Sequence, residues 1–423
     1  MTQAPDHGIL RFLTCGSVDD GKSTLIGRLL YDSKAILADA LDTLERTSRR
    51  RGASGLDLSL LTDGLKAERE QGITIDVAYR YFATGTRKFI LGDTPGHEQY
   101  TRNMVTAAST ADLAVILVDA RKGVLPQTRR HTAIAHLLGI RHLLMAVNKM
   151  DLVDWSEPVF ADIRAEGLAF AEGLGISQMA FMPMSARAGD MVVERGGHLP
   201  WYGGPTLLEH LEAMPLEQED LERPFRFPVQ WVCRPRQGPH QDCRGYAGRV
   251  EAGLVQVGAE IVVHPGQRRS RVRGIRMGED ELPAAQAGQS VTLELDGDLD
   301  IGRGDLLSQA IDPPTPAREL DATLCWFSEQ PAAPGGRFLL HIGTRETRAV
   351  LREIASRLEI STMAHQRAER LVMNDIAEVR IRLQEPVAAD RYETCRSTGA
   401  FILIEETTNA TVAAGMIREV RMG

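Results

Sequence analysis

A glycine-rich loop near the start of the chain constrains its fold more than any other feature. Residues 16–24 read GSVDDGKST and match the pattern G-x-x-x-x-G-K-[ST]. An apolar run at residues 9–13 precedes the loop, and apolar residues at helical spacing follow it. Strand, loop and helix in this order form a phosphate-binding loop, in which backbone N–H groups and a helix N-terminus surround phosphate oxygens. The pattern therefore predicts a nucleotide-binding α/β domain.

The chemistry of such a loop gives its residues distinct roles. Lys22 is expected to reach the β- and γ-phosphates, and the Ser23 hydroxyl is expected to ligate Mg²⁺. The other residues of the loop are expected to contact the nucleotide phosphates, and these are Gly16, Ser17, Val18, Asp19, Asp20, Gly21 and Thr24.

A second motif predicts which base is bound. Asn148, Lys149, Met150 and Asp151 follow an apolar run at residues 142–147 and form the pattern N-K-x-D. The Asp151 carboxylate can accept hydrogen bonds from N1–H and from the exocyclic amine of guanine, a donor pair that adenine lacks. Asn148 is expected to brace the loop, and the Lys149 stem to cover the base plane. Alone the motif is equally typical of a solvated turn, but after a phosphate-binding loop it predicts a guanine site.

A third motif is expected to face the γ-phosphate. Asp93, Thr94, Pro95 and Gly96 follow an apolar run at residues 89–91. Asp93 is expected to hold Mg²⁺ through water, and the Gly96 N–H to meet the γ-phosphate.

A fourth, weaker motif completes the set. Ser185, Ala186 and Arg187 follow an apolar segment at residues 179–184. They suit a loop whose backbone N–H contacts the O6 atom of guanine. Four motifs in this order on alternating strand and helix segments favour a GTP-hydrolysing switch over a generic nucleotide-binding fold.

Two further residues are candidates for hydrolysis. Thr74 precedes an expected strand at residues 77–82, and it is placed to ligate Mg²⁺ and to sense the γ-phosphate, whose loss would release the segment. The alternative is an ordinary β-branched residue that enters a strand. His97 directly follows Gly96 and is placed to orient the attacking water. Together with Lys22, these residues form the predicted catalytic set.

Periodicity and composition divide the chain into three predicted domains. Residues 1–215 alternate strands and helices, which is typical of a doubly wound α/β domain. Glycines and a period of two then predict a β-barrel at residues 224–311, after an acidic linker. A proline-rich break precedes a second predicted β-barrel at residues 317–423, in which residues 348–355 also allow a short helix.

Charge, hydropathy and cysteines exclude several classes of protein. The 423 residues carry a net charge of −8, which disfavours a general nucleic-acid surface. The chain shows no signal-peptide pattern and no run of about 18 apolar residues, so we expect no membrane span. Five scattered cysteines without a C-x-x-C pattern favour reduced thiols in the cytoplasm and no metal-thiolate site.

The combined motifs resemble the translation-factor GTPases of the elongation factor Tu and 1-alpha class. The matching segments are residues 18–24 (VDDGKST), 66–76 (KAEREQGITID), 93–97 (DTPGH) and 148–151 (NKMD). Other segments resemble one branch of that superfamily more closely, namely residues 17–32, 93–104 (DTPGHEQYTRNM), 300–305 (DIGRGD) and 398–404 (TGAFILI). That branch is the large, GTPase subunit of bacterial sulfate adenylyltransferase, and the resemblance covers essentially the whole chain.

The resemblance implies a fold, an activity and a partner. It implies a GTPase domain followed by two β-barrels of translation-factor type, with GTP and Mg²⁺ as cofactors. In that family a smaller catalytic subunit joins ATP and sulfate to give adenosine 5′-phosphosulfate and pyrophosphate, and GTP hydrolysis on the large subunit drives this uphill reaction. Some relatives carry a fused kinase, but no second G-x-x-x-x-G-K-[ST] pattern occurs here, so we expect none.

Two other functions share the nucleotide motifs. One is a translation factor that delivers aminoacyl-tRNA, and the other is a regulatory switch whose hydrolysis is coupled to no chemistry. Aminoacyl-tRNA-dependent hydrolysis would favour the first, and a rate that ignores sulfate would favour the second.

Two segments are harder to assign. Residues 34–71 form a long insertion before Thr74, and long segments of this kind are often functional. Their arginines at positions 49–51 are more typical of a solvated helix face than of a binding patch, and we expect the insertion to transmit nucleotide state to a partner. Residues 234–243 depart from the family, because Cys243 stands where an aromatic residue is expected, and His240 beside it does not complete a metal site.

Overall fold

The computed structural model describes residues 8–36, 41–42, 44, 46–47, 56, 58–61, 76–97, 100–215, 219–234, 244–360, 362 and 364–422. The chain divides into two compact units with the main boundary between Leu216 and Glu217. Thr74, the arginines at 49–51, His240 and Cys243 lie outside the described residues. None of the helices in the described part of the chain is long and apolar enough to cross a membrane.

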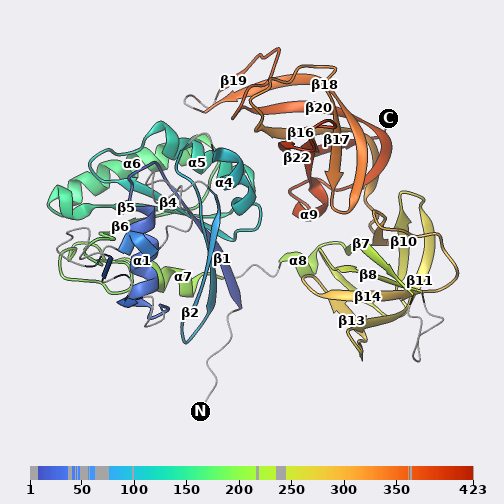
Figure 1. The fold of residues 1–423 in the computed structure, drawn as a ribbon, viewed down its shortest axis with the longest axis horizontal. Helices are drawn as coiled ribbons and strands as arrows, with labels where there is room; N and C mark the ends of the chain where they lie inside the picture. Colours follow the sequence, from blue (N-terminus) through green and yellow to red (C-terminus); the bar gives the residue numbers. More distant parts are fainter. Residues whose placement is uncertain are drawn as a thin grey trace. The chain divides into compact units, whose positions relative to one another are not determined.

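The first unit is an α/β unit built on one sheet (Figure 1). The strand order is β2-β3-β1-β4-β5-β6, and β2 runs antiparallel to β3 while the other neighbours are parallel. This arrangement confirms the predicted doubly wound fold. The elements are β1 (Ile9–Cys15), α1 (Lys22–Asp32), the 3-10 helix η1 (Leu58–Leu61), β2 (Ala78–Ala83), β3 (Lys88–Asp93), α4 (Thr101–Ala108), β4 (Leu113–Asp119), α5 (Pro126–Leu137), β5 (His142–Asn148), the 3-10 helix η3 (Met150–Val153), α6 (Glu157–Gly173), β6 (Met179–Pro183) and α7 (Leu207–Ala213).

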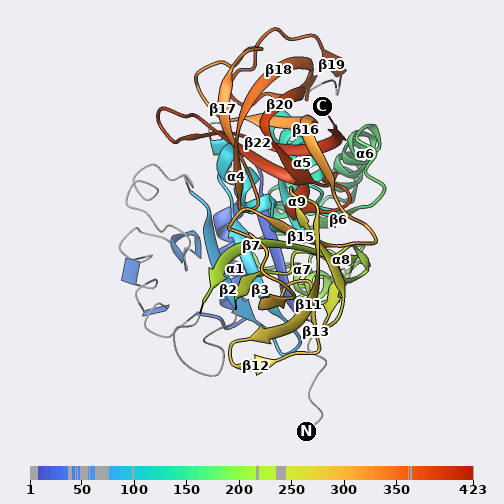
Figure 2. The ribbon, with the colours of Figure 1, turned by 90° about the vertical axis from the view of Figure 1, so that its right-hand side faces the viewer.

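Helices cover both faces of this sheet (Figures 1 and 2). On one face, the apolar side chains of α1 and α7 form a single buried cluster with β1, β3 and β4. On the other face, Phe160 and Ile163 of α6 pack against Val118, Met145 and Val147. Every residue of β4 is buried, as expected for a central parallel strand with helices on both sides.

The strand register brings the sequence motifs to one edge of the sheet. Thr14 of β1 lies opposite Asp93 of β3, and Asp119 of β4 lies opposite Asn148 of β5. Because these strands are parallel, the loops that follow them lie side by side beyond their carboxyl ends. This edge is where ligands bind in open α/β sheets.

The second unit is built almost entirely from strands. One seven-stranded sheet has the order β10-β15-β7-β8-β14-β11-β12 and is closed by pairing of β10 with β11. The other has the order β17-β21-β22-β16-β20-β18-β19 and is closed by pairing of β17 with β18. Each closed sheet surrounds its own hydrophobic cluster, so both predicted barrels are present.

The elements of the second unit in chain order are α8 (Glu219–Glu222), β7 (Arg226–Cys233), β8 (Gly245–Arg249), β9 (Leu254–Gln256), β10 (Glu260–His264), β11 (Arg268–Met277), β12 (Asp280–Glu281), β13 (Ala284–Gln286), β14 (Ser290–Leu295), β15 (Leu306–Gln309), β16 (Thr315–Trp326), β17 (Arg337–Ile342), β18 (Arg345–Glu359), β19 (Ala364–Gln366), β20 (Ile376–Ala389), α9 (Arg396–Gly399), β21 (Ala400–Ile404) and β22 (Thr411–Arg421).

The short helix allowed at residues 348–355 is wrong, because these residues belong to strand β18. Thr347, Ala349 and Leu351 are buried at alternate positions, and the strand pairs with both β17 and β20. Several charged and helix-favouring residues lie on its exposed face. Pairing on both edges and burial of the other face override that local propensity.

A buried ion pair joins the two barrels of the second unit. Arg226 of β7 donates from Nε to Asp390 Oδ2 at 2.7 Å and from Nη2 to Asp390 Oδ1 at 2.8 Å. Its Nη1 donates to the carbonyl oxygens of Phe225 and Asp312, and the Thr398 hydroxyl donates to Asp390 at 2.6 Å. The pair is almost completely buried and fully hydrogen-bonded, which is the condition under which a buried ion pair is tolerated.

Arg226→Met is expected to lower the free energy of unfolding by about 3–5 kcal/mol, because it leaves the Asp390 carboxylate buried without its cation. Urea unfolding of the whole chain, followed by tryptophan fluorescence, measures the loss. Arg380→Met is the matched control, because Arg380 also contacts two carboxylates, Asp321 and Glu353, but is 37% exposed. The control is expected to leave the unfolding midpoint nearly unchanged. Equal losses in both variants would contradict the importance of the buried pair.

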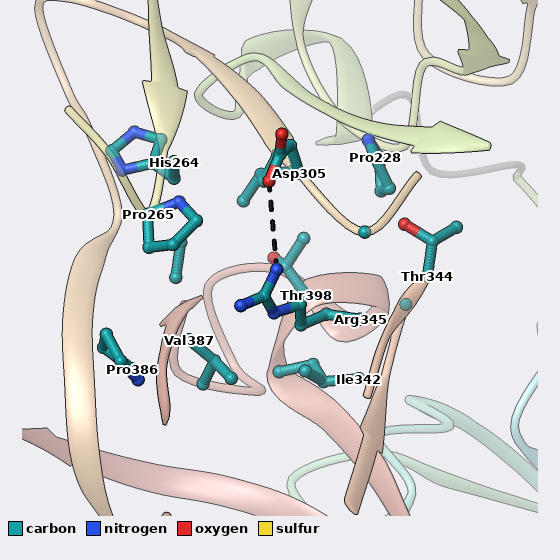
Figure 3. Close-up of a pocket in the computed structure, with 14 residues that line it drawn as sticks. Pro228, His264, Pro265, Asp305, Ile342, Thr344, Arg345, Pro386, Val387 and Thr398 are labelled. Atoms are coloured by element: carbon teal, nitrogen blue, oxygen red, sulfur yellow. Dashed lines mark ion pairs between the residues drawn. The ribbon is translucent and has the colours of Figure 1, made fainter. Parts of the chain in front are cut away.

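A small hollow of about 30 Å³ lies at the same junction (Figure 3). Asp305 and Arg345 face each other across it with 3.9 Å between their charged atoms. Thr398 also lines it, so two segments that resemble the family, residues 300–305 and 398–404, meet here. None of the residues that line the hollow belongs to the nucleotide motifs.

Candidate functional site: a guanine nucleotide site

The phosphate-binding loop connects β1 to α1 and is shaped by its glycines. Gly21 has a φ of +94° in the left-handed region, and a Cβ atom there would lie 2.5 Å from Asn148 Nδ2. Backbone geometry and lack of space therefore both require glycine at this position. The following residue, Lys22, begins the helix, so the helix N-terminus points at the loop as predicted.

The Lys22 ammonium lies inside the loop. Its Nζ donates to the carbonyl oxygens of Gly16 at 2.8 Å and Ser17 at 3.0 Å. Burial lowers the pKa of Lys22, while the carboxylates of Asp93 and Asp20 act in the opposite direction. A buried ammonium at a helix N-terminus is a strong point charge for a phosphate oxygen.

Asp20 places a buried carboxylate inside this loop. Its Oδ2 accepts a hydrogen bond of 2.6 Å from the Ser17 N–H. Burial raises the pKa of Asp20 to about 6, although the nearby Lys22 lowers it. Asp20 Oδ1 and the Ser17 hydroxyl are buried and have no hydrogen-bond partner in the described part of the chain. The loop therefore contains buried polar atoms that a bound nucleotide with its cation can satisfy.

The turn after β3 packs directly against this loop. A Cβ atom on Gly96 would lie 2.5 Å from Lys22 Nζ and 2.7 Å from the Gly16 carbonyl oxygen. Thr94 is buried and donates from its hydroxyl to the Thr14 carbonyl at 2.8 Å. The structure thus brings the first and third motifs together, and only glycine fits where they meet.

The predicted catalytic residues are only partly described. His97 is exposed, and its ring lies edge-on to that of Tyr100 with 6.1 Å between the ring centroids. Thr74 lies outside the described residues. Ser23 and Asp93 are both present at the loop, and their oxygen atoms are of the type that Mg²⁺ prefers.

Asn148 connects the base motif to both neighbouring loops. Its Nδ2 donates to the Asp20 carbonyl at 2.9 Å, and its Oδ1 accepts from the Ala186 N–H at 2.9 Å. This is the geometry expected of a residue that braces the loop. The Ser185 hydroxyl donates to Asp151 Oδ1 at 2.7 Å, so the second and fourth motifs also lie in contact.

Met150 and Lys149 are the other two residues of the base motif, and their side chains differ in exposure: Met150 is buried and Lys149 is half-buried. Met150 is buried in the core cluster beneath α6, so its side chain supports the loop from the protein interior. Lys149 has a φ of +65°, and its Nζ donates to Asp119 Oδ2 at 2.9 Å and to the Asp19 carbonyl. The Lys149 ammonium therefore links the base motif to the phosphate-binding loop.

Asp119 belongs to this site although the sequence motifs do not include it. Its carboxylate is fully buried, and it accepts hydrogen bonds from Lys149 and from the side chain and backbone N–H of Arg121. Burial alone would raise the pKa of Asp119, but these hydrogen bonds hold it below its usual range. Asp119 was not predicted; the only sequence signal that could have found it is an acidic residue at the end of an apolar run.

Arg28 is a second residue that the motifs do not include. It lies on α1 and donates to the carbonyl oxygens of Ala186 and Arg187. No local pattern could reveal these contacts, because Ala186 and Arg187 lie 158 and 159 residues after Arg28 in the chain.

Two family models match parts of this chain. Residues 7–216 match the model of the elongation factor Tu GTP binding domain. Residues 319–418 match the model of the GTP-eEF1A C-terminal domain-like family. A solved structure of sup35 complexed with GDP is 24% identical, with a TM-score of 0.45 and coverage of 98% of this chain and 95% of that one.

Curated relatives match almost the whole chain. The bifunctional enzyme NodQ of Rhizobium sp. (strain N33) is 52% identical over 97% of this chain, which spans 63% of that protein's length. Sulfate adenylyltransferase subunit 1 of Cellvibrio japonicus is 50% identical over 99% of this chain and 88% of its own length. The same subunit of Laribacter hongkongensis is 49% identical over 97% and 85%. The chain therefore belongs to the sulfate adenylyltransferase subunit 1 family, and its first unit is a GTP-binding domain of the elongation factor Tu type.

Proposed function

We propose that this chain is the GTP-hydrolysing subunit of a sulfate adenylyltransferase. In this proposal, GTP hydrolysis drives formation of adenosine 5′-phosphosulfate and pyrophosphate from ATP and sulfate on a separate, smaller catalytic subunit in the cytoplasm. The observation that carries it is the meeting of four guanine-nucleotide motifs at one edge of the sheet. Gly96 lies against Lys22, and Asn148 joins the phosphate-binding loop to the loop of Ala186. The chain is also about half identical to relatives named sulfate adenylyltransferase subunit 1.

The residues divide into a phosphate part and a base part. Lys22 binds the β- and γ-phosphates, and the loop amides around it hold the remaining phosphate oxygens. Ser23, Thr74 and Asp93 are the residues that would hold Mg²⁺, with Asp93 acting through water. The ion supplies positive charge beside the phosphates. His97 orients the attacking water, and its exposure allows it to turn toward the γ-phosphate.

The base part selects guanine. The Asp151 carboxylate accepts from N1–H and the 2-amino group, and the Ser185 hydroxyl keeps that carboxylate in one orientation. Asn148 holds the adjoining loops at fixed separation. Lys149 covers the base with its stem, while Asp119 fixes its ammonium group. Adenine would leave the Asp151 carboxylate without its donors, which is strongly unfavourable in a partly buried site.

Steady-state GTP hydrolysis tests this function. The rate is measured for this chain with its presumed small subunit, with and without ATP plus sulfate. We expect the rate to rise only when the partner, ATP and sulfate are all present. A rate that ignores sulfate and the partner would contradict the proposal, and stimulation by aminoacyl-tRNA would assign the chain to the translation factors instead.

A further inference from the structure

Arg28 holds a distant loop against helix α1. Its Nε donates to the Ala186 carbonyl at 3.2 Å, and its Nη2 donates to the Arg187 carbonyl at 2.8 Å. Its Nη1 lies 3.4 Å from Asp32 Oδ1, one helical turn further on. A Cβ atom on Gly189 would lie in contact with the Arg28 stem, at 3.7 Å from its Cδ. All three nitrogens of the guanidinium group are therefore engaged.

The loop that Arg28 holds satisfies nearly all of its own amide groups. The donors with a protein partner are Ser185 N to Asp190 O, Ala186 N to Asn148 Oδ1, Ala188 N to Ser185 Oγ, and Gly189 N to Ser185 O. The Arg187 N–H is the exception, because it donates to no acceptor among the residues that the structure describes. Arg187 is exposed, so this donor is open to water and is available to a ligand acceptor that replaces the water.

Peptide geometry connects Arg28 to that free donor. The peptide between Ala186 and Arg187 is trans, so its C=O and N–H point in opposite directions. Arg28 binds the carbonyl oxygen of this peptide. The Arg187 N–H is consequently directed away from the Arg28 side chain and is fixed in that direction as long as the contact persists.

We propose that Arg28 is a positioning residue for guanine selection, which fixes this peptide so that the Arg187 N–H donates to the O6 atom of guanine. The inference rests on the proposed guanine site, in which a backbone N–H of this loop reads O6, and it adds the side chain that orients that amide. The contacts of the same loop with Asn148 and Asp151 place it beside the base motif. An oriented donor binds more tightly than a mobile one, because less freedom is lost on binding.

Three nucleotides separate this role from a general structural role. Binding of GDP, inosine diphosphate and 2-aminopurine riboside diphosphate is measured by competition with a fluorescent GDP derivative. Inosine keeps O6 and N1–H but lacks the 2-amino group, whereas 2-aminopurine keeps the 2-amino group but lacks O6 and the N1–H, so its affinity is compared only between variants. Arg28→Met is expected to lower the affinities for GDP and inosine diphosphate by the same factor, roughly three- to tenfold. It is expected to leave the affinity for 2-aminopurine riboside diphosphate unchanged.

Arg129→Met is the matched control. Arg129 is an arginine of similar exposure in the same unit, and it pairs with Glu166 at 2.9 Å and lies over Phe170. The control is expected to leave all three affinities unchanged. Arg28→Lys retains a cation with a shorter reach. It is expected to lower the affinities for GDP and inosine diphosphate by a smaller factor and to leave that for 2-aminopurine riboside diphosphate unchanged. This variant replaces Arg28→Met if the methionine variant fails to fold.

Two results would overturn the role of Arg28. One is equal weakening of all three nucleotides in both Arg28 variants, which would mean a general loosening of the site. The other is unchanged GDP affinity. Failure of the guanine site itself is distinguishable, because the unmodified chain would then bind ADP as tightly as GDP.

Discussion

Replacement of Lys22 by alanine is expected to abolish GTP binding at micromolar concentrations and, with it, all GTP-dependent formation of adenosine 5′-phosphosulfate. Lys22 is buried, and its ammonium lies within hydrogen-bond distance of two loop carbonyls at the start of α1. Hydrogen bonds between charged groups contribute about 1.5–3 kcal/mol each, so loss of contacts to two phosphates corresponds to roughly 10²- to 10⁴-fold in affinity. Equilibrium titration with a fluorescent GTP analogue measures the loss.

Lys88→Ala is the control for this experiment. Lys88 is an exposed lysine at the start of β3, at the opposite end of that strand from Asp93. The control is expected to bind GTP like the unmodified chain. Normal GTP-stimulated turnover in Lys22→Ala would refute the assignment of the phosphate site, and thermal unfolding of both variants shows whether a loss arises from misfolding instead.

Replacement of Asp151 by asparagine is expected to change the preferred base from guanine to xanthine. The Ser185 hydroxyl donates to Asp151 Oδ1 at 2.7 Å, so in the variant it holds the amide oxygen and leaves the amide NH₂ toward the base. That NH₂ can donate to the C2 carbonyl of xanthine but repels the 2-amino group of guanine. We expect GTP affinity to fall by about 10²-fold and xanthosine triphosphate affinity to rise.

Competition between the two nucleotides measures this change. Asp154→Asn is the matched control, because it makes the same chemical change three residues further on, at an exposed side chain. The Asp154→Asn variant is expected to bind GTP more tightly than xanthosine triphosphate, like the unmodified chain. Unchanged GTP affinity in Asp151→Asn would contradict the role given to Asp151.

The meeting of the nucleotide motifs was largely predictable because each motif is local. The phosphate-binding loop needs glycine at one left-handed position, Gly21, and a lysine at the start of a helix, and both requirements are visible in a short stretch of sequence. Each motif directly follows a strand, so parallel pairing of the strands is enough to place the motifs at one edge of the sheet. Strand β18 was harder, because its pairing partners in the sheet decide its conformation and its exposed residues do not.

Contacts between distant segments could not be predicted. Two of these contacts join ordinary charged residues, Lys149 with Asp119 and Arg226 with Asp390. The third joins Arg28 to backbone carbonyl oxygens of a distant loop. All three depend on the folded chain. The domain limits at residues 1–215, 224–311 and 317–423 stay a prediction, and so do the roles of Thr74 and of the insertion at residues 34–71. A protease-protection difference between the states with GDP and with a GTP analogue would support the transmitting role of that insertion.

The most direct test of the central claim is the amount of adenosine 5′-phosphosulfate that accumulates at equilibrium. Both subunits are incubated with ATP and sulfate, and the product is measured with GTP, with a non-hydrolysable GTP analogue, and without guanine nucleotide. Product is expected to accumulate beyond the GTP-free level with GTP but not with the non-hydrolysable analogue, because only hydrolysis supplies free energy to the uphill reaction. The same final level under all three conditions would contradict it, even if GTP brought the mixture to that level faster.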